Sequence, residues 1–319
     1  MDQTTGTGPA SRIIVLATGG TISCTVDRTG ALLPALSGED IVRPVAGRFD
    51  PGVLGVEVRD IARLDSASMT LADIDDVVAA VADALSDPGV DGVVVLHGTD
   101  SMEETAIAVD LFHDDPRPVV FTGAQLPADH PEADGPGNVF EALMIAADDS
   151  ARGIGALIVF GHAVLPVRGA KKWHTTDTLA FATNAPEEPP RPAPLPRTTL
   201  GGTRVDIVAA YPGADGSLVE AALAAGADGL VVEGMGAGNV GTAMAKALGK
   251  ALEAGVPVVM ATRVPRGDVH GTYGGAGGGA TLNRLGAIGS RCVGAPQARV
   301  ILAAAIAASV HPQTLFDAG

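Results

Sequence analysis

Short apolar runs alternate along most of this chain with longer segments rich in Ala and Leu. Several runs, such as residues 92–96, are apolar throughout, as expected of strands that are buried on both faces of a sheet. This alternation is typical of a parallel sheet whose strands are connected by crossover helices, so we expect an α/β fold. The strands expected in the first half of the chain are residues 12–17, 53–60, 92–96, 118–121 and 154–160.

Helix start signals lie between these runs. Thr70 is a plausible N-cap and Asp73 is favourable in the first turn, which predicts a helix to about residue 85. Ser101 and Glu104 have the capping-box spacing and predict a second helix. We expect a third helix over residues 137–147.

A proline-rich segment divides the chain, because six of the eleven residues from 186 to 196 are proline. That composition excludes a helix or a central strand. We therefore expect an N-terminal α/β domain with a parallel sheet and crossover helices over residues 1–185, a linker over 186–198 and a smaller C-terminal α/β domain over 199–319. The C-terminal elements are expected as strands at 205–210, 230–233 and 256–261 and as helices at 218–225, 242–254 and 296–308.

Charge and hydropathy exclude several classes of function. The chain has 319 residues, with 21 Lys and Arg against 37 Asp and Glu, and no cluster of cations that could neutralise nucleic-acid phosphates. The apolar stretch 301–310 is about half of the roughly 20 residues that a membrane-spanning helix needs. Residues 1–9 lack the cationic start and apolar core of a signal peptide. We expect a cytoplasmic protein that binds neither nucleic acid nor membrane.

Metal and disulfide signals are weak in this sequence. Cys24 and Cys292 lie far apart and show no Cys-x-x-Cys spacing, and no two histidines are separated by four positions. We expect neither a metal site nor a disulfide.

Three strand ends are followed by small, polar turns that contain glycine. They are Thr-Gly-Gly-Thr at 18–21, His-Gly-Thr-Asp-Ser at 97–101 and Thr-Gly-Ala-Gln at 122–125. Because ligands bind beyond the carboxyl ends of strands in open parallel sheets, we expect these turns to converge on one crevice. Two threonines and an aspartate would then face a ligand.

These residue types indicate acyl transfer from a small amide. Threonine hydroxyls are weak nucleophiles and need a base, a cation or an orienting group, for which Asp100 and Lys172 are the candidates. Backbone amides of the turns could bind the substrate oxyanion; the candidates are Gly20, Gly98, Gly123 and Ala124. Each element also has a purely structural interpretation, with Asp100 and Ser101 as helix caps and Lys172 as a solvated lysine.

The motifs resemble those of a known family. Residues 18–22, 97–105 and 133–138 are similar to the signatures of bacterial-type L-asparaginases, and the resemblance extends from about residue 12 to 316. It implies hydrolysis of L-asparagine to L-aspartate and ammonia through a threonine-linked acyl-enzyme, without a metal or organic cofactor. It also implies a homotetramer built as a dimer of intimate dimers.

The resemblance assigns roles to individual residues. Thr21 would be the nucleophile, and Thr99, Asp100 and Lys172 would form a second catalytic group. Ser66 would bind the substrate's α-carboxylate. Further substrate contacts are expected from Asp65, which precedes Ser66, from Asp100, which would hold the α-amino group, and from Asn239, which would reach a neighbouring subunit's site.

This chain also departs from the family pattern. Many members have a tyrosine in the lid after the nucleophile, yet residues 22–36 contain none, and the loop 271–275 lacks the glutamate that many members lend to a partner subunit. Ala67 stands where several members have glutamine. We hypothesise that Tyr273, in that loop, supplies from its own or a neighbouring chain the hydroxyl that orients Thr21.

Other functions remain open on the sequence alone. Gly-Ala-Gly-Asn-Val-Gly at 236–241 matches a dinucleotide-binding fingerprint, and Arg263 after the next strand would suit an NADP-dependent oxidoreductase. A non-catalytic amino-acid-binding relative is a further alternative, because the tyrosine and glutamate are missing. A glutaminase-asparaginase of broader specificity is another, since one methylene discriminates substrates by only about 1 to 3 kcal/mol.

Overall fold

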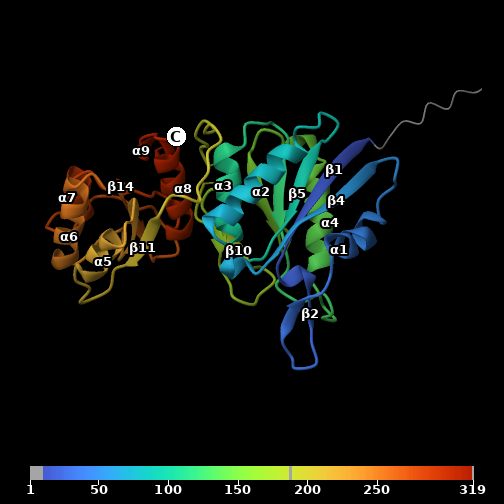
Figure 1. The fold of residues 1–319 in the computed structure, drawn as a ribbon, viewed down its shortest axis with the longest axis horizontal. Helices are drawn as coiled ribbons and strands as arrows, with labels where there is room; N and C mark the ends of the chain where they lie inside the picture. The colour runs from blue at the N-terminus through green and yellow to red at the C-terminus, as the bar shows by residue number, and fades with distance from the viewer. Residues whose placement is uncertain (1–9, 187–188, 318–319) are drawn as a thin grey trace, which may run out of the picture. The chain divides into compact units, whose positions relative to one another are not determined.

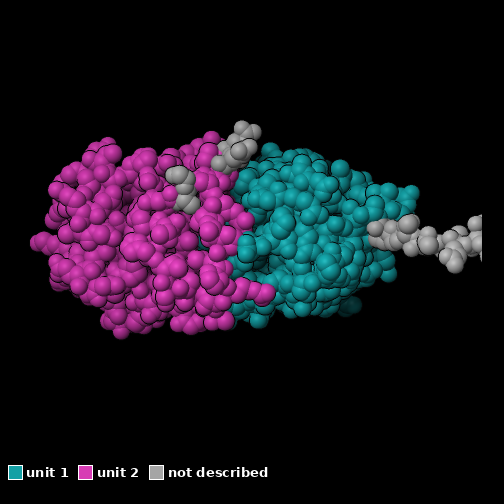
Figure 2. Space-filling view, turned by 90° about the horizontal axis from the view of Figure 1, so that it is seen from above, with its two compact units in different colours: residues 1–167, 172–182 teal, residues 168–171, 183–319 magenta. Residues whose placement is uncertain are grey.

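The computed structural model describes residues 10–186 and 189–317. The chain divides into two compact units, which Figure 2 shows in different colours. Unit 1 consists of the chain up to residue 167 together with 172–182, and unit 2 consists of 168–171 and the chain from 183 onward. The chain passes between the units through two short strands, β9 (Ala170–Lys172) and β10 (Phe181–Thr183).

The expected domain limits can be compared with this division. The limit expected at residue 185 lies close to residue 182, where unit 1 ends. In the expected linker, residues 187 and 188 lie outside the described part of the chain, and residues 189–204 contain no helix or strand. Residues 1–9, on which the expectation about a signal peptide rests, also lie outside it.

Unit 1 is built on a six-stranded sheet with the order β4-β1-β5-β6-β7-β8. The strands are β1 (Ser11–Gly19), β4 (Leu54–Leu64), β5 (Gly92–Leu96), β6 (Val119–Thr122), β7 (Ala156–Phe160) and β8 (Ala163–Pro166). All neighbours pair in parallel except β7 and β8, which form an antiparallel edge. The five strands expected from the apolar runs are therefore confirmed, and β4 continues four residues past its expected end.

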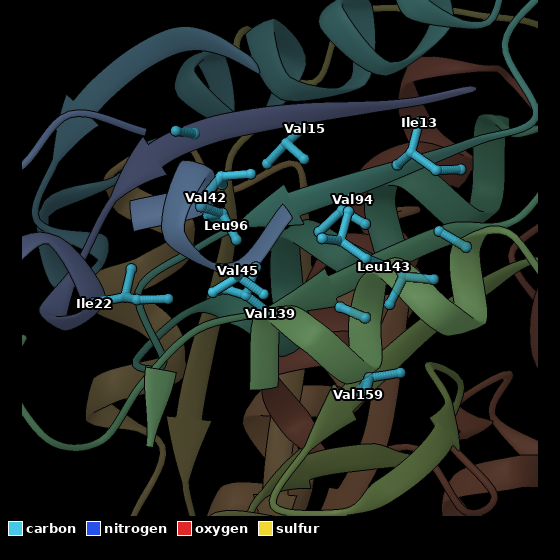
Figure 3. Close-up of a cluster of buried hydrophobic side chains, with 14 of the residues drawn as sticks. Ile13, Val15, Ile22, Val42, Val45, Val94, Leu96, Val139, Leu143 and Val159 are labelled. Carbon is cyan, nitrogen blue, oxygen red and sulfur yellow. The ribbon is translucent and has the colours of Figure 1, made fainter. Parts of the chain in front are cut away.

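Helices cover both faces of this sheet (Figure 1). Helices α1 (Gly38–Ala46) and α4 (Gly135–Ala146) lie on one face, and α2 (Leu71–Ala84) and α3 (Met102–Phe112) lie on the other. Figure 3 shows the core beneath α1 and α4, where residues of alternate positions on β1 and β5 meet apolar residues of the two helices. The continuous apolar strands thus have both faces buried, as expected.

The helix caps agree with the sequence in one case and differ in another. The Thr70 hydroxyl accepts from Asp73 N, and the Asp73 carboxylate accepts from Thr70 N, so the start of α2 is confirmed as a capping box. The capping box expected from Ser101 and Glu104 is wrong, because Ser101 Oγ donates to Ser66 O at 2.7 Å. The Ser101 hydroxyl therefore donates to a carbonyl on another segment and does not cap the first turn of α3.

Several short elements of unit 1 had no sequence prediction. Strands β2 (Cys24–Val26) and β3 (Leu32–Pro34) form an antiparallel hairpin directly after the first glycine turn. Three short 3₁₀ helices are present, η1 (Thr21–Ser23), η2 (Ser66–Ser68) and η3 (Asp149–Ala151).

Unit 2 repeats the layered design on a smaller scale. Its parallel sheet has the order β11-β12-β13-β14, with strands β11 (Val205–Ala209), β12 (Gly229–Gly234), β13 (Val258–Thr262) and β14 (Ile288–Gly289). Its helices are α5 (Ser217–Ala224), α6 (Thr242–Glu253), α7 (Gly279–Arg284), α8 (Ala295–Ala307) and α9 (Gln313–Phe316). The α/β class is confirmed for both units. No helix among the described residues combines the length and apolarity needed to cross a membrane.

Candidate active site

The glycine turns after β1 and β5 meet in close contact at the carboxyl edge of the sheet. A Cβ built on Gly20 would lie 2.4 Å from Gly98 Cα, and Gly20 has a φ of 87°. Glycine is therefore required at this position for both conformation and space. The expected convergence of the first two turns is present in the structure.

Ser66, on the segment that follows β4, packs against Gly98 in this contact. A Cβ on Gly98 would lie 2.4 Å from Ser66 Oγ, and the same oxygen accepts from Asp100 N at 3.3 Å. Ser66 is buried, so its side chain is held in this contact and does not extend into solvent. Asp65 is exposed, and its carboxylate accepts from Ala67 N at 3.2 Å, so it caps η2.

Thr99, Asp100 and Lys172 form one hydrogen-bonded group within unit 1. Lys172 Nζ donates to Thr99 Oγ1 at 2.7 Å and to Asp100 Oδ1 at 2.6 Å. The Thr99 residue is 5% exposed, whereas the Asp100 side chain is 57% exposed, so the lysine links a buried hydroxyl to an accessible carboxylate. The interpretation of Lys172 as an ordinary solvated lysine does not fit a side chain that is only 22% exposed.

The backbone of Lys172 is also held, by a residue that the sequence analysis did not single out. Lys172 N donates to Glu103 Oε2 at 2.5 Å, and Glu103 is a buried residue in the first turn of α3. Glu103 lies within the 97–105 motif, three residues after Asp100. That position was the sequence signal by which it could have been found.

The third turn, after β6, packs against the second. A Cβ on Gly123 would lie 2.3 Å from His97 O, and Ala124 is buried. The Asp134 carboxylate accepts from the amides of Gln125 and Leu126, and this fixes the turn against the start of α4. The 133–138 motif therefore has a clear structural role in shaping the turn.

Gln125 was another omission from the expected site. Its Oε1 accepts from Thr99 Oγ1 at 3.1 Å, and its Nε2 donates to His174 O and Asp177 O. The only sequence signal was its place at the end of the third glycine turn.

Thr21 is the first residue of η1 and is half-buried. Among the described residues, its hydroxyl makes no hydrogen bond, whereas Thr18 Oγ1 donates to Leu96 O at 3.0 Å in the core. The next residue, Ile22, packs into the core cluster beside Val45 and Val139 (Figure 3). Of the two threonines in the first motif, Thr21 is thus the one whose hydroxyl is left for chemistry.

His97 is fully buried behind these turns. Its Nδ1 is 2.7 Å from Gly98 O, and burial lowers the pKa of the imidazole to about 4. A neutral ring with its proton on Nδ1 fits this contact at neutral pH. His97 therefore acts on the conformation of Gly98 and supplies no charge to the site.

Asn239 and Tyr273 lie in unit 2. Asn239 closes the turn after β12 through two backbone hydrogen bonds with Met235, and its Oδ1 accepts from Gly279 N at 3.4 Å. Tyr273 is 62% exposed in the loop that precedes α7. That loop is folded closely on itself, since a Cβ on Gly278 would lie 2.2 Å from Tyr273 O.

The possible dinucleotide fingerprint at 236–241 leaves no open space for a pyrophosphate group. Val240 N donates to Gly277 O at 3.0 Å, and a Cβ on Gly277 would lie 1.9 Å from Val240 O. The backbone around Gly277 therefore occupies the space where a pyrophosphate would approach the start of α6. Within residues 10–186 and 189–317, no three His, Cys, Asp or Glu side chains are grouped to hold a metal ion.

Comparisons with known proteins cover nearly the whole chain. A family model described as Asparaginase, N-terminal, matches residues 12–191, and a model described as Glutaminase/Asparaginase C-terminal domain matches residues 204–317. A probable L-asparaginase from Deinococcus radiodurans is 34% identical over 314 residues, which span 92% of this chain and 93% of the relative. L-asparaginase from Bacillus licheniformis is 29% identical over 319 residues, which span 93% and 95%.

One solved structure extends the similarity to three dimensions. The crystal structure of a probable cytoplasmic L-asparaginase from Campylobacter jejuni matches with a TM-score of 0.85 at 26% sequence identity. The match covers 97% of this chain and 100% of that chain.

Proposed function

The chain belongs to the bacterial-type L-asparaginase family, and from this premise we propose that it hydrolyses L-asparagine to L-aspartate and ammonia through an acyl-enzyme on Thr21. The observation that carries the proposal is the contact of Lys172 Nζ with both Thr99 Oγ1 and Asp100 Oδ1 beside the glycine turn that precedes Thr21. A cation, a buried hydroxyl and an accessible carboxylate are together suited to activate a nucleophile or a water molecule.

In the first half-reaction, Thr21 Oγ attacks the carbon of the side-chain amide. A C–O bond forms, the C–N bond breaks, and ammonia leaves with the proton that Thr21 gives up. Backbone amides of the glycine turns are the candidates for holding the oxyanion that develops at the carbonyl oxygen.

In the second half-reaction, a water molecule attacks the ester carbon and releases aspartate with the Thr21 hydroxyl restored. Thr99, fixed by Lys172, is the group that we propose to orient this water by accepting a hydrogen bond from it, while the proton that the water gives up passes to Thr21 Oγ1 as the ester C–O bond breaks. The Asp100 carboxylate, which is exposed beside them, suits the positive α-amino group of the substrate, and the Ser66 hydroxyl suits its α-carboxylate.

The test is release of ammonia from L-asparagine under steady-state conditions, with L-glutamine as the comparison substrate. We expect continuous turnover of asparagine. Equal or faster release from glutamine would instead identify the glutaminase-asparaginase, and tight binding without release would identify the non-catalytic relative.

We expect the chain to form a tetramer with sites at subunit contacts, on the pattern of the family. Trp173 and Leu179 expose apolar surface on the segment that follows Lys172, and such surface beside a site is suited to a protein contact. Sedimentation at assay concentration should give a species of four times the 31.8 kDa of one chain. An active species with the mass of a single chain would contradict this proposal.

Tyr273→Phe is expected to lower kcat by roughly 10²-fold with little change in KM, because it removes the hydroxyl that we propose to orient Thr21. Tyr211→Phe is the matched control, since Tyr211 is the other tyrosine of the chain and lies at the surface directly after β11. A normal kcat in Tyr273→Phe would show that this hydroxyl does not act on the nucleophile.

A further inference from the structure

The side-chain amide of Gln125 joins two parts of the candidate site. On one side, its Oε1 accepts a hydrogen bond from Thr99 Oγ1 at 3.1 Å. On the other, its Nε2 donates to His174 O at 3.3 Å and to Asp177 O at 3.2 Å. The two carbonyls belong to the segment that follows Lys172 in the chain, so one amide connects that segment with the turn after β5.

These contacts fix the direction of the amide. An amide nitrogen has two protons to donate, and both are used by carbonyl oxygens here. In the flipped orientation, Oε1 would face two carbonyl oxygens, and each of these would lose its donor. Gln125 therefore presents an acceptor to Thr99.

The acceptor in turn determines where the Thr99 proton points. A hydroxyl has one proton and two lone pairs. Lys172 Nζ donates to one lone pair at 2.7 Å, and the proton is directed to Gln125. The remaining lone pair is the part of the Thr99 hydroxyl that is left to accept a hydrogen bond from a water molecule.

The backbone of Gln125 is held as firmly as its side chain. Its N–H donates to both carboxylate oxygens of Asp134, at 3.2 and 3.0 Å. Asn138 Nδ2 donates to Asp134 Oδ2 and to Gly123 O, which braces the same turn from α4. This packing leaves the amide little freedom to leave Thr99.

We propose that Gln125 is a positioning residue that fixes the Thr99 hydroxyl as a hydrogen-bond acceptor for the attacking water during hydrolysis. The inference rests on the proposed function, since it assigns a part to Thr99 in the same reaction. Without the amide, the Thr99 proton can rotate toward the substrate or the water and occupy the position from which Thr99 must accept.

The test compares Gln125→Met with the wild-type enzyme on L-asparagine. Methionine has a similar length and only a weakly accepting thioether in place of the amide oxygen, so we expect kcat to fall by about tenfold, the equivalent of one hydrogen bond. KM should stay within about twofold, because the substrate contacts that we assign do not include Gln125. The thermal midpoint should stay within a few degrees.

Two further variants make the result specific. Gln125→Asn keeps an amide but withdraws its oxygen from Thr99 by one methylene, so it should show the same loss of kcat and serves if the methionine variant does not fold. Gln313→Met is the matched control, because Gln313 is on α9 and contacts the exposed Asp317 just after that helix, and it should keep the wild-type kcat.

Each outcome bears on the inference. Wild-type kcat in either Gln125 variant, or a loss that appears only in KM or only with a large fall of the thermal midpoint, would overturn the role of Gln125 and leave the proposed function standing. Absence of ammonia release by the wild-type protein would overturn the proposed function and this inference together.

Discussion

Thr21→Ala is expected to abolish hydrolysis of L-asparagine, with kcat reduced by about 10⁴-fold or more. The variant removes the hydroxyl to which we assign the acyl-enzyme, and the neighbouring hydroxyls cannot replace it. Thr18 is committed to Leu96 O in the core, and Thr99 is held by Lys172 and Gln125. The fold should persist, because the anchor of η1 in the core is the adjacent Ile22.

Activity, stability and intermediate formation should be measured on the same preparations. Thr21→Ser keeps a hydroxyl and should keep measurable turnover, and Thr314→Ala, on α9 in unit 2, should behave as the wild type. Hydroxylamine added during turnover should trap the acyl group as aspartyl hydroxamate with the wild-type enzyme and not with Thr21→Ala. Retention of even a tenth of the wild-type kcat by Thr21→Ala would exclude Thr21 as the nucleophile.

Strands β5, β6 and β7 of unit 1 and β12 and β13 of unit 2 could be predicted because they are short and largely apolar runs. In β5, every residue from Gly92 to Leu96 is buried, so the continuous apolar run had one plausible structural meaning. Helix α2 could be predicted because its cap is local, with the Thr70 and Asp73 side chains each accepting from the other's backbone N–H.

Elements that depend on tertiary contacts could not be predicted. Helix α1 contains Pro44, which argues against a helix interior, yet Val42 and Val45 pack into the core of unit 1 and the N-terminal Ser37 and Asp40 form a capping box. Strand β14 has two residues and is defined by its pairing with β13. Ser101 was misread because its hydroxyl finds Ser66 O, a partner 35 positions away.

The residues of the candidate site likewise divide into those that local sequence predicts and those that only tertiary contacts reveal. The glycine turns could be identified because each follows a strand, and parallel strands end at one edge. The need for glycine at 20, 98 and 123 became clear only in the structure, where each Cβ would collide with another segment. Gln125 and Glu103 were missed because a single amide or carboxylate has no spacing signature, and their partners lie 26 to 69 positions away.

The glycine contacts also limit how the turns that carry Thr21 and Thr99 can move. Gly20 touches Gly98, Gly98 touches the Ser66 side chain, and Gly123 touches the carbonyl of His97, so the turns are packed mainly through backbone atoms. Such packing leaves few rotamers to adjust, because backbone atoms cannot move as side chains do. We infer that substitution of these glycines would displace Thr21 and Thr99 relative to each other.

Lys172→Met is expected to lower kcat by about 10³-fold, or about 4 kcal/mol of transition-state stabilisation, within the range for loss of a proton-transfer or orienting group. Methionine can fill the partly buried channel of the lysine stem, so the fold should persist. The variant removes the donor to Thr99 Oγ1 and the partner of Asp100 at once. KM should change by less than about threefold, because the Asp100 carboxylate remains available to the substrate's α-amino group.

Two lysine variants separate the charge from its placement. Lys172→Arg keeps a positive charge but spreads it over a planar fork that does not match the two contacts made by one ammonium nitrogen, so it should remain at least about 10²-fold impaired. Lys250→Met, which removes an exposed lysine on α6 that lies 3.8 Å from Glu220, should keep the wild-type kcat. If Lys172→Arg were fully active, the cation would act only through its field, and the hydrogen bond to Thr99 would have no part in catalysis. If Lys172→Met were fully active, Thr99 would have to be activated by Asp100 alone, and the hydrogen-bonded group would be a structural brace for β9.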